Sequence, residues 1–392
     1  MMRLAKRSVS LVASPIAEAH AWLPHRTGER PLLDLSQAAP SYPTAPEIAA
    51  HVADVAHRAD GGRYAPPPGL PALREAFAAE MSRDYAAAID PEHILPTGGC
   101  NQAFCAVLSA LTERGDEVIL PVPYYFNHDM WLQLQGVQPV YLHPAHRPSF
   151  DDPAALVPDP ERAASLVTDR TRAIVLVTPA NPTGVTTPPE VIAAFHDVAV
   201  ARGLVLVLDE TYRNFRSVDD PAHDLFGRDP RAEHVVSLHS FSKDLAIPGY
   251  RVGAIVGAAP LLYESLKFVD CVQISAPRIG QEAVVAGLTR AGGWRRDQAA
   301  RIAASQRRFE DVMASRPGGF ELVAAGAFFG WVRHPFAMST DEVVKRLVLD
   351  HDVLAIPGTA FMPADQGFLR FSFANLDDEQ LRELGRRLAE LG

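Results

Sequence analysis

The sequence predicts an α/β protein with a large, mostly parallel β-sheet and a smaller α+β domain. Short runs of β-branched and other apolar residues alternate with amphipathic stretches through the middle of the chain, which is typical of a parallel sheet covered by helices on both faces. The 392 residues are 47% hydrophobic and 21% charged. The chain can therefore bury a sizeable core and does not have the composition of a disordered protein.

The expected elements follow from the local pattern. Strands are expected at 117–120, 138–142, 173–178, 204–208, 235–238 and 253–256, where short apolar runs occur. Helices are expected at 70–85, 100–111 and 188–202, where apolar residues recur at helical spacing. Near the C-terminus the sequence predicts long amphipathic helices, strand-rich pieces at 318–332 and 353–373, and a final helix at 377–391.

These elements divide the chain into three segments. An N-terminal arm over 1–45 is expected to pack with the small domain, 46–276 to form the large domain, and 277–392 to form the small C-terminal domain. The arm begins with basic residues ahead of a mildly apolar stretch over 9–17, as a signal peptide does. Serines and a proline interrupt that stretch, so we expect an ordered or frayed arm instead.

The composition argues against several kinds of partner. The 37 Lys and Arg residues against 47 Asp and Glu residues give a net charge of −10, whereas nucleic-acid binding needs clustered basic residues. No apolar run approaches the roughly 18 residues that a membrane span needs. The cysteines Cys100, Cys105 and Cys271 are odd in number and form no CxxC pair, which is typical of a reducing compartment, so the cytoplasm is the predicted location.

Several common catalytic motifs are missing from the sequence. It contains no Walker A motif, HExxH, GxSxG, EF-hand loop or strand-linked GxGxxG. The 14 histidines do not pair at metal-ligand spacing. Nucleotide hydrolysis, zinc proteolysis and serine esterase chemistry are therefore not expected, and neither is a metal site.

Lys243 is the first candidate catalytic residue. It follows the strand expected at 235–238, in the segment Ser240-Phe241-Ser242-Lys243, so its side chain should leave the sheet edge and enter a partly desolvated cleft. Burial lowers the pKa of an amine, and a neutral amine forms a Schiff base with an aldehyde. Pyridoxal phosphate is the commonest aldehyde cofactor held in this way.

A carboxylate and three further side chains fit the same cofactor. Asp209 ends the apolar strand at 204–208, where a carboxylate is costly unless it meets a cation such as a protonated pyridine nitrogen. Tyr212 and Asn181 can donate to the ring hydroxyl oxygen, and Tyr125 offers an aromatic face for stacking. Taken alone, the Asn-Pro-Thr-Gly segment at Asn181 is equally typical of a turn, and Tyr125 of an ordinary core.

A glycine-rich segment predicts a phosphate site. Gly98, Gly99 and Cys100 open a predicted helix, where backbone amides can approach an anion at the positive end of the helix dipole. Ser240 and Arg251 can complete the site, because a guanidinium binds phosphate through charge-assisted hydrogen bonds.

Taken together, these motifs resemble the class I/II aminotransferase family, a fold type I group that depends on pyridoxal 5'-phosphate. The resemblance spans nearly the whole chain and rests on the joint order and spacing of motifs that are individually common. The matching positions are Tyr64, Gly98, Gly99, Cys100, Tyr125, Asn181, Asp209, Tyr212, Ser240, Ser242, Lys243, Arg251 and Arg370.

The resemblance implies a role for each position. Lys243 would form the internal aldimine and later move a proton between the substrate and cofactor carbons. Asp209 would hold the pyridinium, Asn181 and Tyr212 would bond the ring hydroxyl, and Tyr125 would stack on the ring. The residues implied to hold the phosphate are Gly98, Gly99, Cys100, Ser240 and Arg251, with Tyr64 and Ser242 also among the cofactor-binding positions.

Two arginines and Tyr64 extend the implied site. Arg370 matches the arginine that clamps the substrate α-carboxylate, and Asn181 is also placed against the substrate. Tyr64 matches a residue that reaches the phosphate of the neighbouring subunit, which implies a homodimer with shared active sites. Arg278 lies in a stretch that borders the neighbouring active site in relatives. It either meets an acidic or polar distal group of the substrate or is a solvent-facing arginine.

The predicted reaction is transfer of an amino group from an L-amino acid to a 2-oxo acid by a ping-pong route through the Lys243 aldimine. A lyase, a synthase or an oxidase is the nearest alternative, because the same carbanion can eliminate a β or γ substituent, close a ring or react with oxygen. A cofactor-binding regulator is a third hypothesis. The arm is too short and too rich in proline to add the winged helix that such a regulator needs.

Overall fold

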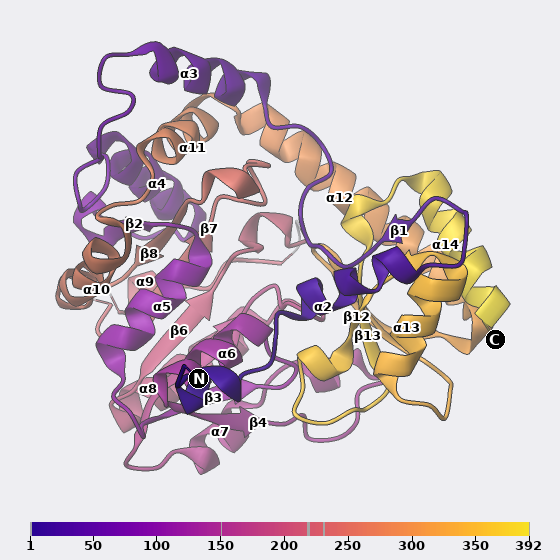
Figure 1. Cartoon of the computed structure of the whole chain (residues 1–392). Coiled ribbons are helices and arrows are strands. Elements are labelled where there is room, and N and C mark those ends of the chain that lie inside the picture. Colours follow the sequence, from indigo (N-terminus) through magenta and orange to yellow (C-terminus); the bar gives the residue numbers. More distant parts are fainter. Residues whose placement is uncertain (1, 150, 218–219, 230–231, 392) are drawn as a thin grey trace.

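A seven-stranded sheet lies at the centre of the larger part of the molecule (Figure 1). The computed structural model describes residues 2–149, 151–217, 220–229 and 232–391. The strand order is β2-β8-β7-β6-β5-β3-β4. The strands are β2 (Ile94–Thr97), β3 (Glu117–Pro121), β4 (Gln138–Leu142), β5 (Thr171–Val177), β6 (Val205–Asp209), β7 (Val235–Ser240) and β8 (Gly253–Val256).

The sheet is mostly parallel, as the sequence predicts. Strands β4, β3, β5, β6 and β7 pair in parallel, whereas β8 pairs antiparallel with both β7 and β2. The strands expected from the sequence are confirmed, with ends that differ by no more than two residues. The sequence reasoning missed β2, a strand of four residues that contains Pro96. A proline is tolerated there because β2 lies at the edge of the sheet.

Alternating side chains bury both faces of this sheet. In β6, Val207 packs into one hydrophobic cluster, whereas Leu206 and Leu208 pack into another on the opposite face, and none of the three is exposed. The covering helices are α3 (Pro46–His57), α4 (Pro71–Asp84), α5 (Cys100–Leu111), α6 (Phe126–Gln135), α7 (Pro160–Leu166), α8 (Pro189–Arg202), α9 (Leu225–Arg228), α10 (Ala259–Gln273) and α11 (Arg278–Arg290).

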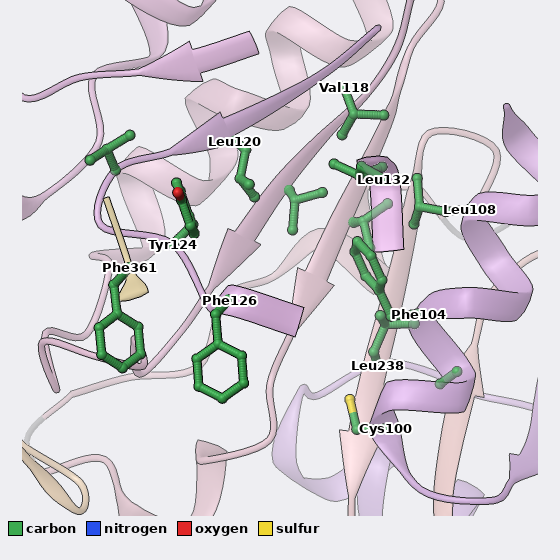
Figure 2. Close-up of a cluster of buried hydrophobic side chains, with 14 of the residues drawn as sticks. Cys100, Phe104, Leu108, Val118, Leu120, Tyr124, Phe126, Leu132, Leu238 and Phe361 are labelled. Atoms are coloured by element: carbon green, nitrogen blue, oxygen red, sulfur yellow. The ribbon is translucent and has the colours of Figure 1, made fainter. Parts of the chain in front are cut away.

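One of these clusters lies directly behind the cavity described below. Figure 2 shows Cys100, Phe104 and Leu108 on the same helix, facing strand side chains that include Leu238. These four side chains are at most 7% exposed. The N-terminal turn of α5 is therefore anchored against the sheet by its own apolar face.

The smaller part of the molecule is built around a second sheet. Its order is β12-β13-β10-β9, with antiparallel pairing throughout. Its strands are β9 (Glu321–Gly326), β10 (Phe329–Arg333), β12 (Ile356–Pro357) and β13 (Phe368–Ser372). Its helices are α12 (Gly292–Ala314), α13 (Thr340–His351) and α14 (Asp378–Leu391). The strand-rich pieces and the final helix predicted from the sequence are confirmed.

The N-terminal residues touch both parts of the molecule (Figure 1). Helix α1 (Lys6–Val9) contacts α6, and α2 (Pro15–Ala21) contacts β12. Strand β1 (Leu33–Asp34) then pairs in parallel with β11 (Val353–Leu354) of the smaller part. We call the segment 35–45, which returns from β1 to α3, the strap.

Helix α11 packs mainly on α3 and α4 of the larger part. The division of the chain at residues 45 and 276 stays a prediction. No helix in the part of the chain that the structure describes is long and apolar enough to cross a membrane.

Candidate active site

A cavity of about 210 Å³ opens at the carboxyl ends of three neighbouring strands, β5, β6 and β7. Open α/β sheets place their ligands at this edge. The lining residues come from the strand ends, the start of α5 and the turn before α6. They are Cys100, Asn101, Tyr125, Val177, Asn181, Asp209, Thr211, Tyr212, Ser240, Ser242, Lys243 and Arg251.

Lys243 presents a weakly basic amine to this cavity. Burial, together with the positive charges of Arg370 and Arg251, lowers the pKa of Lys243 to about 8. Its Nζ donates a hydrogen bond to the carbonyl of Ala38 in the strap. No carboxylate among the described residues forms an ion pair with it. The amine is therefore unprotonated in a sizeable fraction of molecules near pH 8.

Asp209 is a buried carboxylate on the floor of the cavity. Its Oδ2 lies 3.1 Å from Nε2 of His128, and its Oδ1 accepts from the backbone amide of Thr211 at 3.0 Å and from Sγ of Cys100 at 3.6 Å. Burial alone would raise the pKa of Asp209, but the hydrogen bonds from His128 and Thr211 lower it below its usual value. Asp209 is therefore ionised at neutral pH.

His128 was not predicted as part of the site. It lies on the first turn of α6, and its ring stacks on Phe104 at 3.9 Å and meets the edge of Tyr125 at 5.1 Å. These two contacts fix the ring so that Nε2 faces Asp209. The only signal in the sequence was a histidine shortly after Tyr125, which does not by itself indicate a partner.

The start of α5 and Arg251 form a positively polarised cradle. Gly99 adopts a left-handed φ of 92°, and a Cβ at this position would overlap the guanidinium of Arg251. Arg251 donates to the carbonyl of Pro248 at 2.9 Å, and the described residues offer it no carboxylate within salt-bridge distance. The first amides of a helix have no partner within the helix. These groups together suit a phosphate.

Gln102 and Gln273 support this cradle and were also missed from the sequence. Oε1 of Gln102 accepts from the backbone amide of Gly98 at 2.5 Å and from Nε2 of Gln273 at 3.0 Å. Gln273 lies at the end of α10, far along the chain. Its contribution therefore depends on tertiary packing that no local pattern indicates.

Arg370 is a buried cation beside the cavity. The residue is 1% exposed, and its Nη1 donates to Oδ1 of Asn181 at 2.9 Å. Its Nη2 donates to the carbonyl of Ser36 in the strap, and its guanidinium lies 5.1 Å from the ring centres of Phe329 and Phe361. Burial lowers the pKa of Arg370 to about 10.

The guanidinium of Arg370 lacks a counter-charge within the described chain. Its Nε is buried without a hydrogen-bond partner there, and no described carboxylate forms an ion pair with it. A buried cation without a counter-charge is unfavourable. The geometry therefore suits an incoming carboxylate that makes a bidentate contact.

The loop that carries Asn181 also touches the smaller part of the molecule. Gly184 has a φ of 77°, and a Cβ on Gly184 would overlap the backbone of Gly326 at the end of β9. The converse also holds, because a Cβ on Gly326 would overlap the carbonyl of Gly184. Two backbones thus meet here without intervening side chains.

Comparison with known proteins identifies the family. The sequence model described as aminotransferase class I and II matches residues 30–388. The chain belongs to this aminotransferase family.

Relatives with established names agree with this result. The chain is 32% identical over 369 residues to a probable aspartate/prephenate aminotransferase of Thermus aquaticus, covering 92% of this chain and 91% of that protein. It is 29% identical over 334 residues to an aromatic aminotransferase of Arabidopsis thaliana, covering 83% and 80%. A solved aspartate aminotransferase of Thermus thermophilus with maleate superposes with a TM-score of 0.90 at 27% identity, covering all of both chains. The fold type I architecture and the predicted family resemblance are confirmed.

Aminotransferases of this family use pyridoxal 5'-phosphate, and the cavity fits that cofactor. The cradle at Gly99 and Arg251 suits its phosphate, and Asp209 offers a carboxylate to its ring nitrogen. Lys243 offers an amine whose lowered pKa suits reaction with an aldehyde. The cofactor prediction is therefore confirmed by the family and is consistent with the chemistry of the lining residues.

Tyr212 and Tyr125 line the same cavity as Asp209. Tyr212 is 4% exposed and packs edge-on against Phe328 and Phe329. The hydroxyl of Tyr125 accepts from Nδ2 of Asn127 at 2.8 Å. Burial raises the pKa of each tyrosine, so both hydroxyls keep their protons.

Two predicted residues lie apart from this cavity. The side chain of Tyr64 is exposed, with 73% of its surface accessible. Arg278 donates to the carbonyls of Arg63 and Tyr64 at 3.1 and 3.4 Å, and its Nη1 lies 3.4 Å from a carboxylate oxygen of Asp60. Within a single chain, Arg278 therefore holds the backbone at Tyr64.

Proposed function

We propose that this aminotransferase moves an amino group from an L-amino acid to a 2-oxo acid, with Lys243 as the residue that moves the proton. One juxtaposition supports the proposal. A weakly basic amine at Lys243 and an ionised carboxylate at Asp209 share one cavity, and Asn181 connects that cavity to the uncompensated guanidinium of Arg370. These groups serve the aldehyde, the ring nitrogen and the substrate carboxylate, respectively.

When bound, pyridoxal phosphate supplies an aldehyde and a ring that accepts the electron pair left on the α-carbon after proton loss. The ionised carboxylate of Asp209 keeps a proton on the ring nitrogen, which strengthens that capacity. The amine of Lys243 takes the α-proton and returns a proton to the cofactor carbon that carried the aldehyde. Its pKa of about 8 lets it act as base and as acid near neutral pH.

The orientation of Asn181 assigns it a specific contact. Its Oδ1 accepts from Arg370, so Nδ2 remains free to donate to the ring hydroxyl oxygen. Tyr212 would donate to the same oxygen, and Tyr125 would stack on the ring. Ser240, Ser242 and the cradle residues bind the phosphate.

Arg370 orients the substrate. Its guanidinium binds the substrate α-carboxylate through two hydrogen bonds. This contact directs the α-proton toward Lys243 and neutralises the buried charge of Arg370. The carbonyl of Ser36 and the rings of Phe329 and Phe361 fix the guanidinium plane. The site therefore selects substrates with a carboxylate next to the amino-bearing carbon.

We also infer a homodimer in which Tyr64 reaches the phosphate in the partner subunit. The aromatic side chain of Tyr64 is exposed and therefore accessible to a partner subunit. Large apolar side chains on α10 and just beyond it are also exposed, at Tyr263, Val272 and Ile274. Sedimentation of the purified protein as a monomer, with full cofactor affinity in Tyr64→Ala, would contradict the shared site. The reduced cysteines are consistent with the cytoplasm as the location.

The central experiment uses purified protein loaded with pyridoxal phosphate. A panel of amino acids is mixed with the protein, and the 2-oxo acid products and conversion of the cofactor to its amine form are measured. Lys243→Ala should abolish turnover and the visible absorbance of the lysine-bound cofactor. Retention of both by the variant would exclude Lys243 as the reacting amine.

A second candidate function rests on one relative. The chain is 28% identical over 346 residues to a 1-aminocyclopropane-1-carboxylate synthase of Oryza sativa, covering 82% of this chain and 70% of that protein. Lyase, synthase or oxidase chemistry on an amino-acid-like substrate is therefore the alternative. Release of ammonia or of a leaving group without a 2-oxo acid acceptor would favour it over amino transfer.

Arg278 offers a test of substrate choice. A contact with an acidic distal group of the substrate in the partner's site is the functional hypothesis, and aspartate aminotransferases are among the relatives. Its contacts with Asp60 and with the carbonyl of Tyr64 favour a purely structural role instead. Kinetics of Arg278→Ala on dicarboxylic and neutral amino acids decide between them, because an unchanged preference excludes the substrate contact.

A further inference from the structure

Two of the active-site residues are followed in the chain by residues that bond to each other. Asp244 follows Lys243, and Asn214 lies two positions after Tyr212. Nδ2 of Asn214 donates to Oδ2 of Asp244 at 2.7 Å. Asp244 is 6% exposed, so this bond is shielded from competition by water.

A long helix of the smaller part reaches the same carboxylate. Nη2 of Arg295, near the start of α12, donates to Oδ2 of Asp244 at 2.7 Å. Arg295 also bonds both carboxylate oxygens of Glu80 in α4, at 2.6 and 3.0 Å. Asp244 therefore joins the Lys243 segment to α12 and, through Arg295, to α4.

Glu80 closes the network through a second arginine. Arg213, which lies between Tyr212 and Asn214, pairs with Glu80 and with Asp84 of α4. Arg213 is 6% exposed and Glu80 is 5% exposed. The turn after Tyr212 is thus held to α4 by Arg213 and to Asp244 by Asn214.

Stability alone does not account for charges placed this way. Buried ion pairs commonly contribute little compared with well-packed apolar residues, because desolvation offsets the attraction. Their geometry, however, is directional and fixes the backbones that carry them. Here those backbones carry the amine that moves the proton and the hydroxyl that meets the ring oxygen.

We propose that Asp244 is a positioning residue, whose bonds to Asn214 and Arg295 hold Lys243 and Tyr212 in register with one another. The proposal rests on the function proposed above. It assigns Asp244 no contact with substrate or cofactor. It predicts that loss of the carboxylate misplaces Lys243 relative to the cofactor while leaving binding of the amino acid nearly intact.

The test compares holoenzyme variants with the parent. Asp244→Ala should lower kcat by roughly 10- to 100-fold, because sub-ångström to ångström displacements cost that much, while KM for the amino acid changes by less than about threefold. The visible circular dichroism per bound cofactor should also change, because it reports cofactor orientation. Asp244→Asn retains an acceptor oxygen for Arg295 and should recover most of both signals.

Asp84→Ala is the matched control within the same network. It removes a bond to Arg213 but none to Asp244, so it should lower Tm while leaving kcat and the dichroism at parent values. If Asp244→Ala does not fold, Asn214→Ala is the alternative. It removes the hydrogen bond between Asn214 and Asp244 by deleting the uncharged donor, and it should reproduce the loss in kcat. Double-variant analysis of positions 214 and 244 should show non-additive effects on kcat.

Two results would overturn the proposal. One is parent-like kcat and dichroism in Asp244→Ala or in Asn214→Ala. The other is a fall in kcat in Asp84→Ala that is as large, relative to its fall in Tm, as the fall in Asp244→Ala. That result would show that the network acts through stability alone. Amino transfer by the parent tests the proposed function separately, because each effect here is a ratio to the parent.

Discussion

The two ends of the active-site cavity differ in how their charges are satisfied. One end contains Asp209 and is called the ring end, because Asp209 is proposed to bind the cofactor ring. There Asp209 has hydrogen bonds from His128, Thr211 and Cys100, which belong to the larger part of the molecule. The other end contains Arg370 and is called the substrate end. Among the described residues, the guanidinium of Arg370 has hydrogen bonds to Asn181 and to a strap carbonyl, and its Nε has no partner. The described chain thus satisfies the charge at the end proposed to hold the cofactor and leaves a charge unsatisfied at the end proposed to meet a substrate anion.

The largest expected effect is at the ring end. Asp209→Ala should lower kcat by about 10³-fold, because removal of one preorganised electrostatic group typically costs 10²- to 10³-fold and this group also fixes the ring's charge. The measurement is kcat at saturating cofactor. Asp224→Ala is the control, because Asp224 is exposed and, among the described residues, forms an ion pair only with Arg228. A loss below tenfold would mean that the ring end needs no carboxylate.

A substitution at the substrate end should cause a slightly smaller loss of activity, seen in kcat/KM. Arg370→Gln should lower kcat/KM for amino acids by roughly 10²-fold or more, because truncating one partner of a buried charge pair costs about 2–5 kcal/mol. The absorbance of bound cofactor should remain, because Arg370 does not hold it. Arg346→Gln, an exposed arginine paired with Glu342, is the control. Equal loss of cofactor binding would remove the distinction between the two ends.

The amine of Lys243, which lies in the same cavity, should make the stability of the cofactor-free protein depend on pH. The pKa of Lys243 falls from 10.5 to about 8 on folding, so below pH 8 the folded state bears the cost of a buried cation. That cost disappears as pH rises from about 8 to 10.5, because the unfolded chain then binds more protons than the folded one.

Lys243→Met removes this cost, so the cofactor-free variant should be more stable than the parent at pH 7 by up to about 3 kcal/mol. Urea unfolding at several pH values measures the difference, which should narrow above pH 8. A difference that stays constant from pH 7 to pH 10 would show that the amine titrates at its ordinary pKa.

His128→Phe should have the smallest effect and sharpens the account of the ring end. The new ring keeps the stack on Phe104 but loses the bond to Asp209, so the pKa of Asp209 should rise. Thr211 and Cys100 still bond the carboxylate, so kcat should fall by only about tenfold. A profile of kcat against pH measures both changes, with the acid limb moving to higher pH. An unmoved limb would assign the lowered pKa of Asp209 to its other partners.

The residues that could be predicted from the sequence are those next to strand ends. Asn181, Asp209 and Lys243 each follow an apolar run whose end is easy to recognise, and parallel strands bring such ends to one edge. The contributions that could not be predicted are made by backbone carbonyls and by distant partners. Ser36 acts through its carbonyl, and His128 and Gln273 act through packing of helices against the sheet.

The same distinction applies to the fold. Strands buried on both faces were predictable from their apolar runs, and β8 was found although its antiparallel direction was not. Strand β2 escaped because Pro96 weakens the strand pattern and an edge position tolerates it. Local pattern therefore predicts which segments form elements, while direction and edge position depend on pairing.

The glycine pair at 184 and 326 restricts how this site can diverge. Asn181 and Arg370 belong to different parts of the molecule, and the spacing of those parts is set locally by two backbones that touch. A methyl group on either glycine would overlap the backbone of the other and push the two parts of the molecule apart. Laboratory evolution toward bulkier substrates should therefore accumulate changes around the cavity rim while these two positions stay invariant.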